Sequence, residues 1–448
     1  MLPLPRWDRD THSLASHPVP ADVITLPLRG TFQIPSNESH IMISISEQIA
    51  RMSNGSTITL TTDVEEAVVL PEGRRLKFDL GGHTWSAPVG ETPLTVLGGT
   101  ADIRNGTIRS AGNAAIRLGQ KSEDAASEPV SAAILANDLQ VVSEDDVGVF
   151  LAAGARLDTA ADISAFGEYA AIQGNGSATH WYNSAYITGG TVTAKNMAIY
   201  WPQVGDLHIS GGTITGGTGV EVRAGTLTIS GGTITGTASP SSVTPNGNGS
   251  TSDGVGVAIA QHSTEQTISA TIRGGTIQGY SAVYQSNPQG NPGSKDQVKL
   301  AITNGTFAAI NGGTVPVFSE DLTGVVSGGT FNGAVPQELC AEGFAVVQQS
   351  DGSYRTSNSE WDYMEGGATG AGFLGLRRFI ITASGYQYKE GGIDTANITF
   401  EPVALLSATA RGGITGWYDP VARRILLYRD GKEAVGQIDG LTLVMIGR

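Results

Sequence analysis

The chain has little of what stabilises small secreted proteins or inserts into membranes. It contains one cysteine, Cys340, in 448 residues, so it cannot form an intramolecular disulfide and we expect the thiol to be buried. No run approaches the roughly 18 apolar residues of a membrane span. The N-terminal residues MLPLPRWDRDTHS lack the apolar stretch of a signal peptide. We therefore expect no disulfide framework, no membrane partner and no export signal.

Charged and aromatic residues are also scarce, at 15% and 6% of the chain. Acidic residues outnumber basic ones, and the formal net charge is −15. Nucleic acid phosphates and anionic membrane surfaces would repel such a chain, so we expect neither as a partner. Glycine, in contrast, occurs 61 times, which is typical of β structure with many turns.

The stretch from Tyr186 to Gly236 repeats one pattern three times. A run of apolar residues and threonine is followed by GGTV or GGTI and then by a polar turn. The threonines at positions 191, 213 and 233 are 22 and 20 residues apart, a period that fits one coil of a solenoid. Alternating apolar and polar residues predict strands on both sides of a Gly-Gly corner. Glycine suits this corner because a sharp bend requires positive φ or leaves no room for Cβ.

The same motif continues beyond this stretch with longer loops. Thr276, Thr306 and Thr330 carry further copies. Residues 237–254 and 285–296 are rich in Ser, Pro, Gly and Asn and interrupt the pattern. We expect both segments to be exposed loops, because they can bury little apolar surface.

The residues before the repeat predict an arm and a cap. Residues 1–40 are rich in Pro and Ser without a period and predict an extended N-terminal arm. Ser44 and Glu47 have the spacing of a capping box, which predicts a short helix ending at about Ser53. Such a helix would cover the open end of the solenoid, which otherwise exposes unpaired strand edges.

The residues after Arg355 lose the period. Short apolar strands there meet at an Asp419-Pro420 turn and an Asp430-Gly431 hairpin turn. We expect residues 357–448 to form a small antiparallel β-sandwich or barrel.

Two segments carry a resemblance to a known group of proteins. STITLTTDVEEAVVLPEGRRLKFDLGGHTWSA, residues 56–87, resembles the opening coils of right-handed parallel β-helix proteins of gut Firmicutes and their phages. VVSGGTFNGAVPQELCAEGFAVVQQSDGSYR, residues 325–355, is similar to their closing segment, a short helix and a terminal hairpin. Residues 416–448 resemble the ends of head-decoration proteins of tailed phages. The resemblance implies an all-β fold, a right-handed parallel β-helix over residues 41–356 with a short N-terminal capping helix and a small C-terminal antiparallel β domain.

Residue patterns that indicate catalysis are rare. Glycosidases on a β-helix need carboxylates brought together on neighbouring coils. Between residues 195 and 253 the charged residues are Asp206, Glu221 and Arg223, and the two carboxylates among them do not stand at coil spacing. The acidic cluster Glu144–Asp146 is interpreted as a solvated loop. Seven histidines show no spacing typical of metal ligands. The sequence therefore favours a protein without catalytic residues, metal or cofactor.

Aromatic residues offer a second way to recognise sugars, because a flat ring stacks on the apolar face of a pyranose. Trp181 and Tyr182 stand about one coil before Tyr200 and Trp201. We predict these four residues as a glycan-stacking strip on the flank of the solenoid, with Tyr280 and Tyr284 as candidates to extend it. The alternative is that the rings fill the core or pack under a loop.

These observations favour a structural protein of a phage virion. We expect a head-decoration or head-fibre protein, assembled in the host cytoplasm and released by lysis, that exposes its β-helix to host or mucosal glycans. The expected partners are the major capsid protein or other virion proteins, and further copies of the chain, as a trimer. Two alternatives remain open: a tail fibre or tailspike that binds a receptor and could degrade polysaccharide, and a secreted bacterial adhesin.

Overall fold

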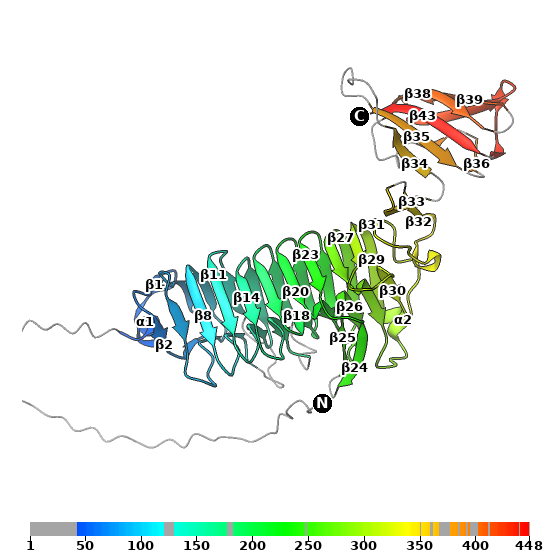
Figure 1. Cartoon of the computed structure of the whole chain (residues 1–448). Helices are drawn as coiled ribbons and strands as arrows, with labels where there is room; N and C mark the ends of the chain where they lie inside the picture. The colour runs from blue at the N-terminus through cyan, green and yellow to red at the C-terminus, as the bar shows by residue number, and fades with distance from the viewer. Residues whose placement is uncertain are drawn as a thin grey trace, which may run out of the picture. The chain divides into compact units, whose positions relative to one another are not determined.

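The computed structural model describes most of the chain from Ile43 onward (Figure 1). In the repeat region the described residues are 43–120, 130–176, 182–246, 249–349 and 351–358. In the C-terminal part they are 362–366, 377–383, 386–390, 393–394, 402–410, 413–438 and 440–447. The arm predicted for residues 1–40 lies outside them.

The repeat region is a parallel β-helix in which each coil adds strands to three stacks (Figure 1). The first stack contains β1 (Thr57–Thr59), β4 (Arg75–Asp79), β7 (Thr100–Arg104), β10 (Ser131–Leu135), β13 (Ala155–Thr159), β16 (Asn183–Ile187), β19 (Gly205–Ile209) and β22 (Gly225–Ile229). The second contains β2 (Val64–Glu65), β5 (Thr84–Ser86), β8 (Gly106–Ser110), β11 (Leu139–Ser143), β14 (Asp162–Ala165), β17 (Thr191–Ala194), β20 (Thr213–Gly216), β23 (Thr233–Gly236) and β31 (Thr330–Phe331).

Two long strands run through both of these stacks, namely β27 (Ile268–Gly279) and β29 (Val298–Ala309). The third stack contains β3 (Val68–Leu70), β6 (Leu94–Val96), β9 (Ile116–Leu118), β12 (Val149–Leu151), β15 (Ile172–Gly174), β18 (Met197–Trp201), β21 (Thr218–Val222), β26 (Val255–Ala260), β28 (Ser281–Ser286) and β30 (Val317–Ser319). The predicted fold class is therefore confirmed.

The motif threonines are in register along the second stack. Thr191 pairs with Thr213, which pairs with Thr233, and the column continues through the later copies Thr276, Thr306 and Thr330. The residue after each threonine points into the core, where Ile214, Ile234 and Ile277 lie one above the other and are fully buried. The sequence period thus stacks like residues on like, so each coil buries its apolar row against its neighbours.

The glycine corners combine the two predicted reasons for glycine. At the second position the backbone has positive φ, for example 85° at both Gly212 and Gly232. At the corner Gly231–Gly232 the preceding coil also leaves no room for a side chain, because a Cβ on Gly231 would lie 2.3 Å from the carbonyl oxygen of Ser210 and a Cβ on Gly232 2.8 Å from that of Gly211. At this corner, positive φ thus applies to the second glycine and the lack of room to both.

The N-terminal end of the solenoid carries the predicted helix, α1 (Ile45–Arg51). Ser44 Oγ accepts a hydrogen bond from Glu47 N at 3.1 Å, and the Glu66 carboxylate accepts one from Ile45 N at 2.7 Å. Arg74 donates to the carbonyls of Ile49 and Met52 near the end of the helix. These contacts fasten the helix over the first coil.

The two segments predicted as exposed loops are more ordered than expected. In the first segment, β24 (Ser242–Asn246) and β25 (Gly249–Asp253) pair antiparallel and are called the β24–β25 hairpin. The second segment contains the helical turn α2 (Ser294–Gln297) and buries Asn291, whose Nδ2 donates to the Gln261 side chain and the His262 carbonyl. The prediction from composition was wrong for these segments, because backbone pairing and polar contacts order them without an apolar pattern.

The C-terminal end of the solenoid matches the implied closing segment. The turn η1 (Gln337–Leu339) is followed by the hairpin β32 (Phe344–Gln348) and β33 (Tyr354–Asn358), and β33 also pairs antiparallel with β31. Cys340 is buried beside this turn, as expected.

The C-terminal part is an antiparallel β domain with its own core, as predicted. One sheet contains β34 (Asp362–Gly366), β35 (Arg377–Ala383), β43 (Leu441–Gly447) and β38 (Pro402–Thr409). The remaining strands are β36 (Tyr386–Tyr388) with β42 (Gly436–Ile438), and β37 (Ile393–Asp394), β40 (Arg424–Arg429), β39 (Ile414–Asp419) and β41 (Lys432–Glu433). The predicted turns lie between β39 and β40 and between β40 and β41.

Candidate functional site

The outer side of the first stack presents two columns of side chains that point away from the core. Consecutive coils place them in register, because successive strands pair residue by residue. The first column runs through Arg75, Thr100, Ala132, Arg156, Ser184 and Asp206. The second runs through Lys77, Asp102, Ile134, Asp158, Tyr186 and His208.

Three of these side chains stack on one another. The Tyr186 and His208 rings are parallel, with centroids 4.9 Å apart and 5° between their planes. On the other side of the tyrosine, the Arg156 guanidinium carbon lies 4.7 Å from the ring centroid. Asp158 holds that guanidinium through two hydrogen bonds, of 2.7 and 3.0 Å. We call Arg156, Tyr186 and His208 the stacked ladder.

Tyr182 lies at the margin of the stacked ladder and is 62% exposed. Its hydroxyl donates a hydrogen bond to Asp206, and this bond is the main cause that raises the pKa of Tyr182 to about 12. His208 Nε2 is 3.9 Å from the same carboxylate. The margin therefore combines an aromatic face with a carboxylate and an imidazole, groups that orient sugar hydroxyls.

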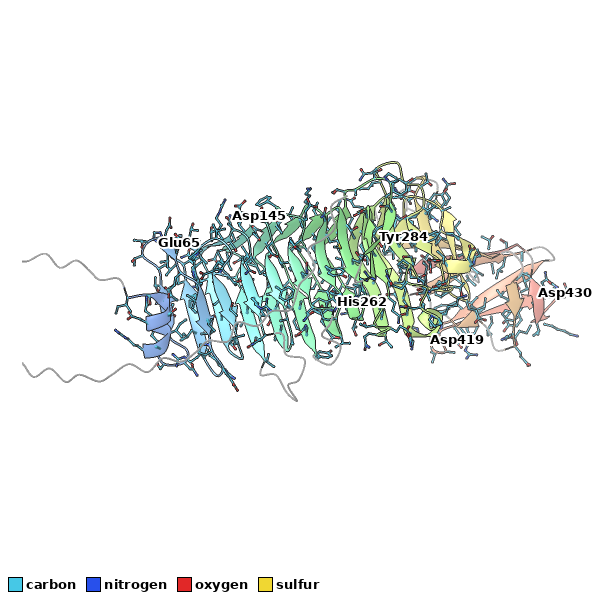
Figure 2. All side chains as sticks on the ribbon, turned by 90° about the horizontal axis from the view of Figure 1, so that it is seen from below. Glu65, Asp145, His262, Tyr284, Asp419 and Asp430 are labelled. Carbon is cyan, nitrogen blue, oxygen red and sulfur yellow. The ribbon has the colours of Figure 1, made fainter. Side chains whose placement is uncertain are left out.

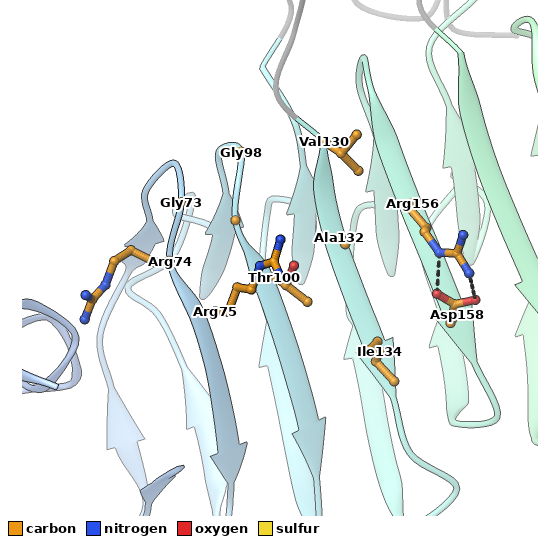
Figure 3. Close-up of a pocket in the computed structure, with 11 residues that line it drawn as sticks. Gly73, Arg74, Arg75, Gly98, Thr100, Val130, Ala132, Ile134, Arg156 and Asp158 are labelled. Atoms are coloured by element: carbon orange, nitrogen blue, oxygen red, sulfur yellow. Dashed lines mark hydrogen bonds and ion pairs between the residues drawn. The ribbon is translucent and has the colours of Figure 1, made fainter. Parts of the chain in front are cut away.

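A pocket of about 420 Å³ opens beside the stacked ladder (Figure 3). Arg156 belongs to both, and Asp158, which holds its guanidinium, also lines the pocket, so the two features are continuous. The other residues that line the pocket are Gly73, Arg74, Arg75, Gly98, Gly99, Thr100, Val130, Ala132 and Ile134. Small residues in the middle of the pocket leave the space open between its charged ends.

The structure separates the three described residues of the four predicted as an aromatic strip. Trp181 lies outside the described residues. Tyr182 precedes β16 of the first stack, whereas Tyr200 and Trp201 belong to β18 of the third. Trp201 is 0% exposed and packs in the core, so it cannot stack on a ligand. The expected side-by-side arrangement of Tyr182 with Tyr200 and Trp201 is therefore not formed.

Tyr200 and Tyr284 do share a column, on the outer side of the third stack. The pairing runs from Tyr200 through Glu221 and Ala258 to Tyr284. Tyr284 stacks on Phe318, with ring centroids 4.8 Å apart. This pair is a second aromatic surface, which the sequence reasoning reached only in part.

A buried polar cluster includes Glu221 of this column. Glu221 and Arg223 are both 0% exposed, and Glu221 Oε2 accepts a hydrogen bond from Ser252 N of the β24–β25 hairpin at 3.3 Å. Burial raises the pKa of Glu221 to about 8, against the opposing charge of Arg223. Burial also lowers the pKa of His262 to about 4. A deeply buried carboxyl of this kind holds its proton near neutral pH.

The acidic cluster Glu144–Asp146 has partners of its own. Glu144 forms an ion pair with Arg109, and Asp145 lies exposed at the edge of the β-helix (Figure 2). Burial raises the pKa of Asp146, whereas a hydrogen bond from Val147 N and the Arg117 charge lower it. These contacts account for the cluster without a ligand.

Across the described ranges, no three His, Cys, Asp or Glu side chains come together as metal ligands. Within the same ranges, no helix has the length and apolar character to cross a bilayer.

Comparisons with known proteins returned no match to a family model, to a curated protein or to a solved structure.

Proposed function

We propose that the protein is a structural component of a phage particle, a head-decoration or head-fibre protein, whose β-helix adheres to host or mucosal glycans without cleaving them. The observation that carries the adhesive part is the exposed ring of Tyr182 at the margin of the stacked ladder. Because Arg156 and His208 cover the two faces of Tyr186, the ring that can stack on the apolar side of a pyranose is Tyr182, and Asp206 supplies an acceptor beside it.

The virion part of the proposal rests on the resemblance of residues 56–87, 325–355 and 416–448 to phage and gut-bacterial proteins. A phage particle displays many copies of its surface proteins, and avidity multiplies weak contacts. One stacking contact contributes on the order of 1 kcal/mol, so single sites would bind poorly. A trimer held on the particle by the major capsid protein or another virion protein would supply the required copies.

The test of adhesion is the Tyr182→Ala variant of the full chain, measured by biolayer interferometry on immobilised mucin and host polysaccharide. Loss of one stacking contact, about 1 kcal/mol of binding free energy, should weaken binding roughly fivefold per site. Trp417→Ala is the matched control, because Trp417 is an exposed aromatic residue of the C-terminal domain. Equal binding by wild type and Tyr182→Ala, or no binding by wild type, would contradict the proposal.

A second candidate function is polysaccharide cleavage by the same face. Asp102 and Asp158 occupy one column with Ile134 between them, a separation of about two strand spacings or roughly 10 Å. Inverting glycosidases hold their two carboxyl groups about 6.5–9.5 Å apart. Asp158, however, is engaged by Arg156, which favours a role in binding. Release of reducing ends by wild type, abolished in Asp102→Asn, would select this candidate instead.

A further inference from the structure

We infer that the pocket beside the stacked ladder receives an anionic group of the bound glycan, so that the ligand is an acidic sugar carrying a carboxylate or a sulfate ester. This inference rests on the proposed adhesive function and adds to it the chemical class of the ligand.

The charge of the pocket is opposite to that of the chain. Three arginines and one aspartate line it, whereas the whole protein carries a formal charge of −15. A local surplus of guanidinium groups on an acidic protein attracts anions to this place and repels them elsewhere.

The three arginines are not equally available. Arg74 donates to the carbonyls that end helix α1, and Arg156 is held by Asp158 and by the Tyr186 ring. Arg75 is exposed, and no carboxylate among the described residues forms an ion pair with it. Arg75 is therefore the cation of this pocket that remains to bind an anion from outside.

The surroundings of Arg75 suit a sugar that continues toward the ladder. Thr100, its partner in register, lies beside it in the pocket and carries a hydroxyl (Figure 3). Ala132 follows in the same column before Arg156, and Ile134 and Val130 give an apolar wall. From Arg75 to Arg156 is three strand spacings, about 14 Å. An anion at Arg75 thus places the adjoining rings toward Tyr186.

An arginine at this position also explains which anions fit. The planar guanidinium matches a carboxylate or a sulfate with two parallel hydrogen bonds, which a lysine cannot reproduce. Neutral sugars would use only Tyr182 at the margin of the stacked ladder. We therefore expect acidic sugars to bind more tightly than neutral ones of the same size.

The experiment displaces the full-length protein from immobilised mucin with 3′-sialyllactose, galactose 6-sulfate or lactose at low salt. At least one acidic probe should displace it at about fivefold lower concentration than lactose. Mucin treated with sialidase or with sulfatase then tells whether the carboxylate or the sulfate is recognised. In Arg75→Ala the acidic probe should lose its advantage over lactose, while the lactose concentration that displaces the protein should stay unchanged. Arg75→Lys should restore part of the advantage of the acidic probe.

The matched control is Arg273→Ala, which removes an exposed arginine of β27 outside the pocket and should leave all three probes unaffected. Equal potency of the three probes against wild type would overturn the acidic ligand and leave adhesion standing. A loss in Arg75→Ala that is the same for acidic probes and lactose would overturn it as well. If wild type does not bind mucin, the proposed function itself fails.

Discussion

We predict that the contribution of Glu221 to the free energy of unfolding falls as the pH rises from about 4.5 to about 8. The carboxyl is fully buried on the third stack, under the β24–β25 hairpin. Its Oε2 accepts one hydrogen bond at 3.3 Å, and Oε1 has no hydrogen-bond partner among the described residues. Burial therefore raises the pKa of Glu221 from 4.5 to about 8, although Arg223 opposes the shift.

The direction follows from counting protons in the two states. Between pH 4.5 and 8 the folded protein keeps the proton on Glu221 and the unfolded chain has lost it. The folded state then binds more protons, so the free energy of unfolding falls with rising pH by about 1 kcal/mol per pH unit. His262, whose pKa burial lowers to about 4, works in the opposite direction below pH 6.5. A difference between two variants is therefore needed to isolate Glu221.

The assay compares wild type with Glu221→Gln by urea denaturation at intervals from about pH 3 to pH 9. Glutamine has the shape of the protonated acid but cannot ionise, so the difference in unfolding free energy should stay constant below about pH 4, where Glu221 is protonated in both states. It should then grow in favour of Glu221→Gln by a few kcal/mol toward pH 8. A difference that does not change with pH would refute the reasoning, since Glu221 would then titrate alike in both states.

Two substitutions test the stacking of the coils. Gly231→Ala should destabilise the fold by about 1–3 kcal/mol in the same assay, because the new Cβ would lie 2.3 Å from the Ser210 carbonyl oxygen. Gly189→Ala is its control at the equivalent corner, where the nearest atom is 3.5 Å away, and equal effects of the two would count against the argument. Ile234→Ala leaves a cavity in a fully buried column and should cost about 2–5 kcal/mol, whereas a cost below about 1 kcal/mol would show that the column collapses to fill it.

The fold could be predicted from the sequence because a solenoid repeats the same residue types at the same position of each coil, and these residues make the same contacts with the neighbouring coils. Thr191, Thr213 and Thr233 recur at the coil period and lie directly above one another. The same reasoning failed for β24 and β25, because these two strands are held by pairing with each other and not by a repeated apolar row. Periodicity locates what is stacked and says nothing about segments that leave the stack.

The candidate site was predicted only at Tyr182, because side-chain direction depends on the phase of a strand. Tyr200 and Trp201 are neighbours in β18 and therefore face opposite sides, one toward the outside and one into the core. Sequence spacing between coils cannot tell which of the two is outside. The burial of the flanking residues decides it, and that follows from the three-dimensional packing.

A signal for the stacked ladder was nevertheless present in the repeat. Tyr186 and His208 each stand three residues before the first glycine of a GGT motif. Equivalent positions in consecutive coils must pair in register, so the two rings had to meet on one face, as they do at 4.9 Å. Aligning the coils on the glycine corner, and only then comparing aromatic residues, would have found this pair. For a β-helix, the position of a residue within its coil is thus a better guide to a binding face than its distance along the chain.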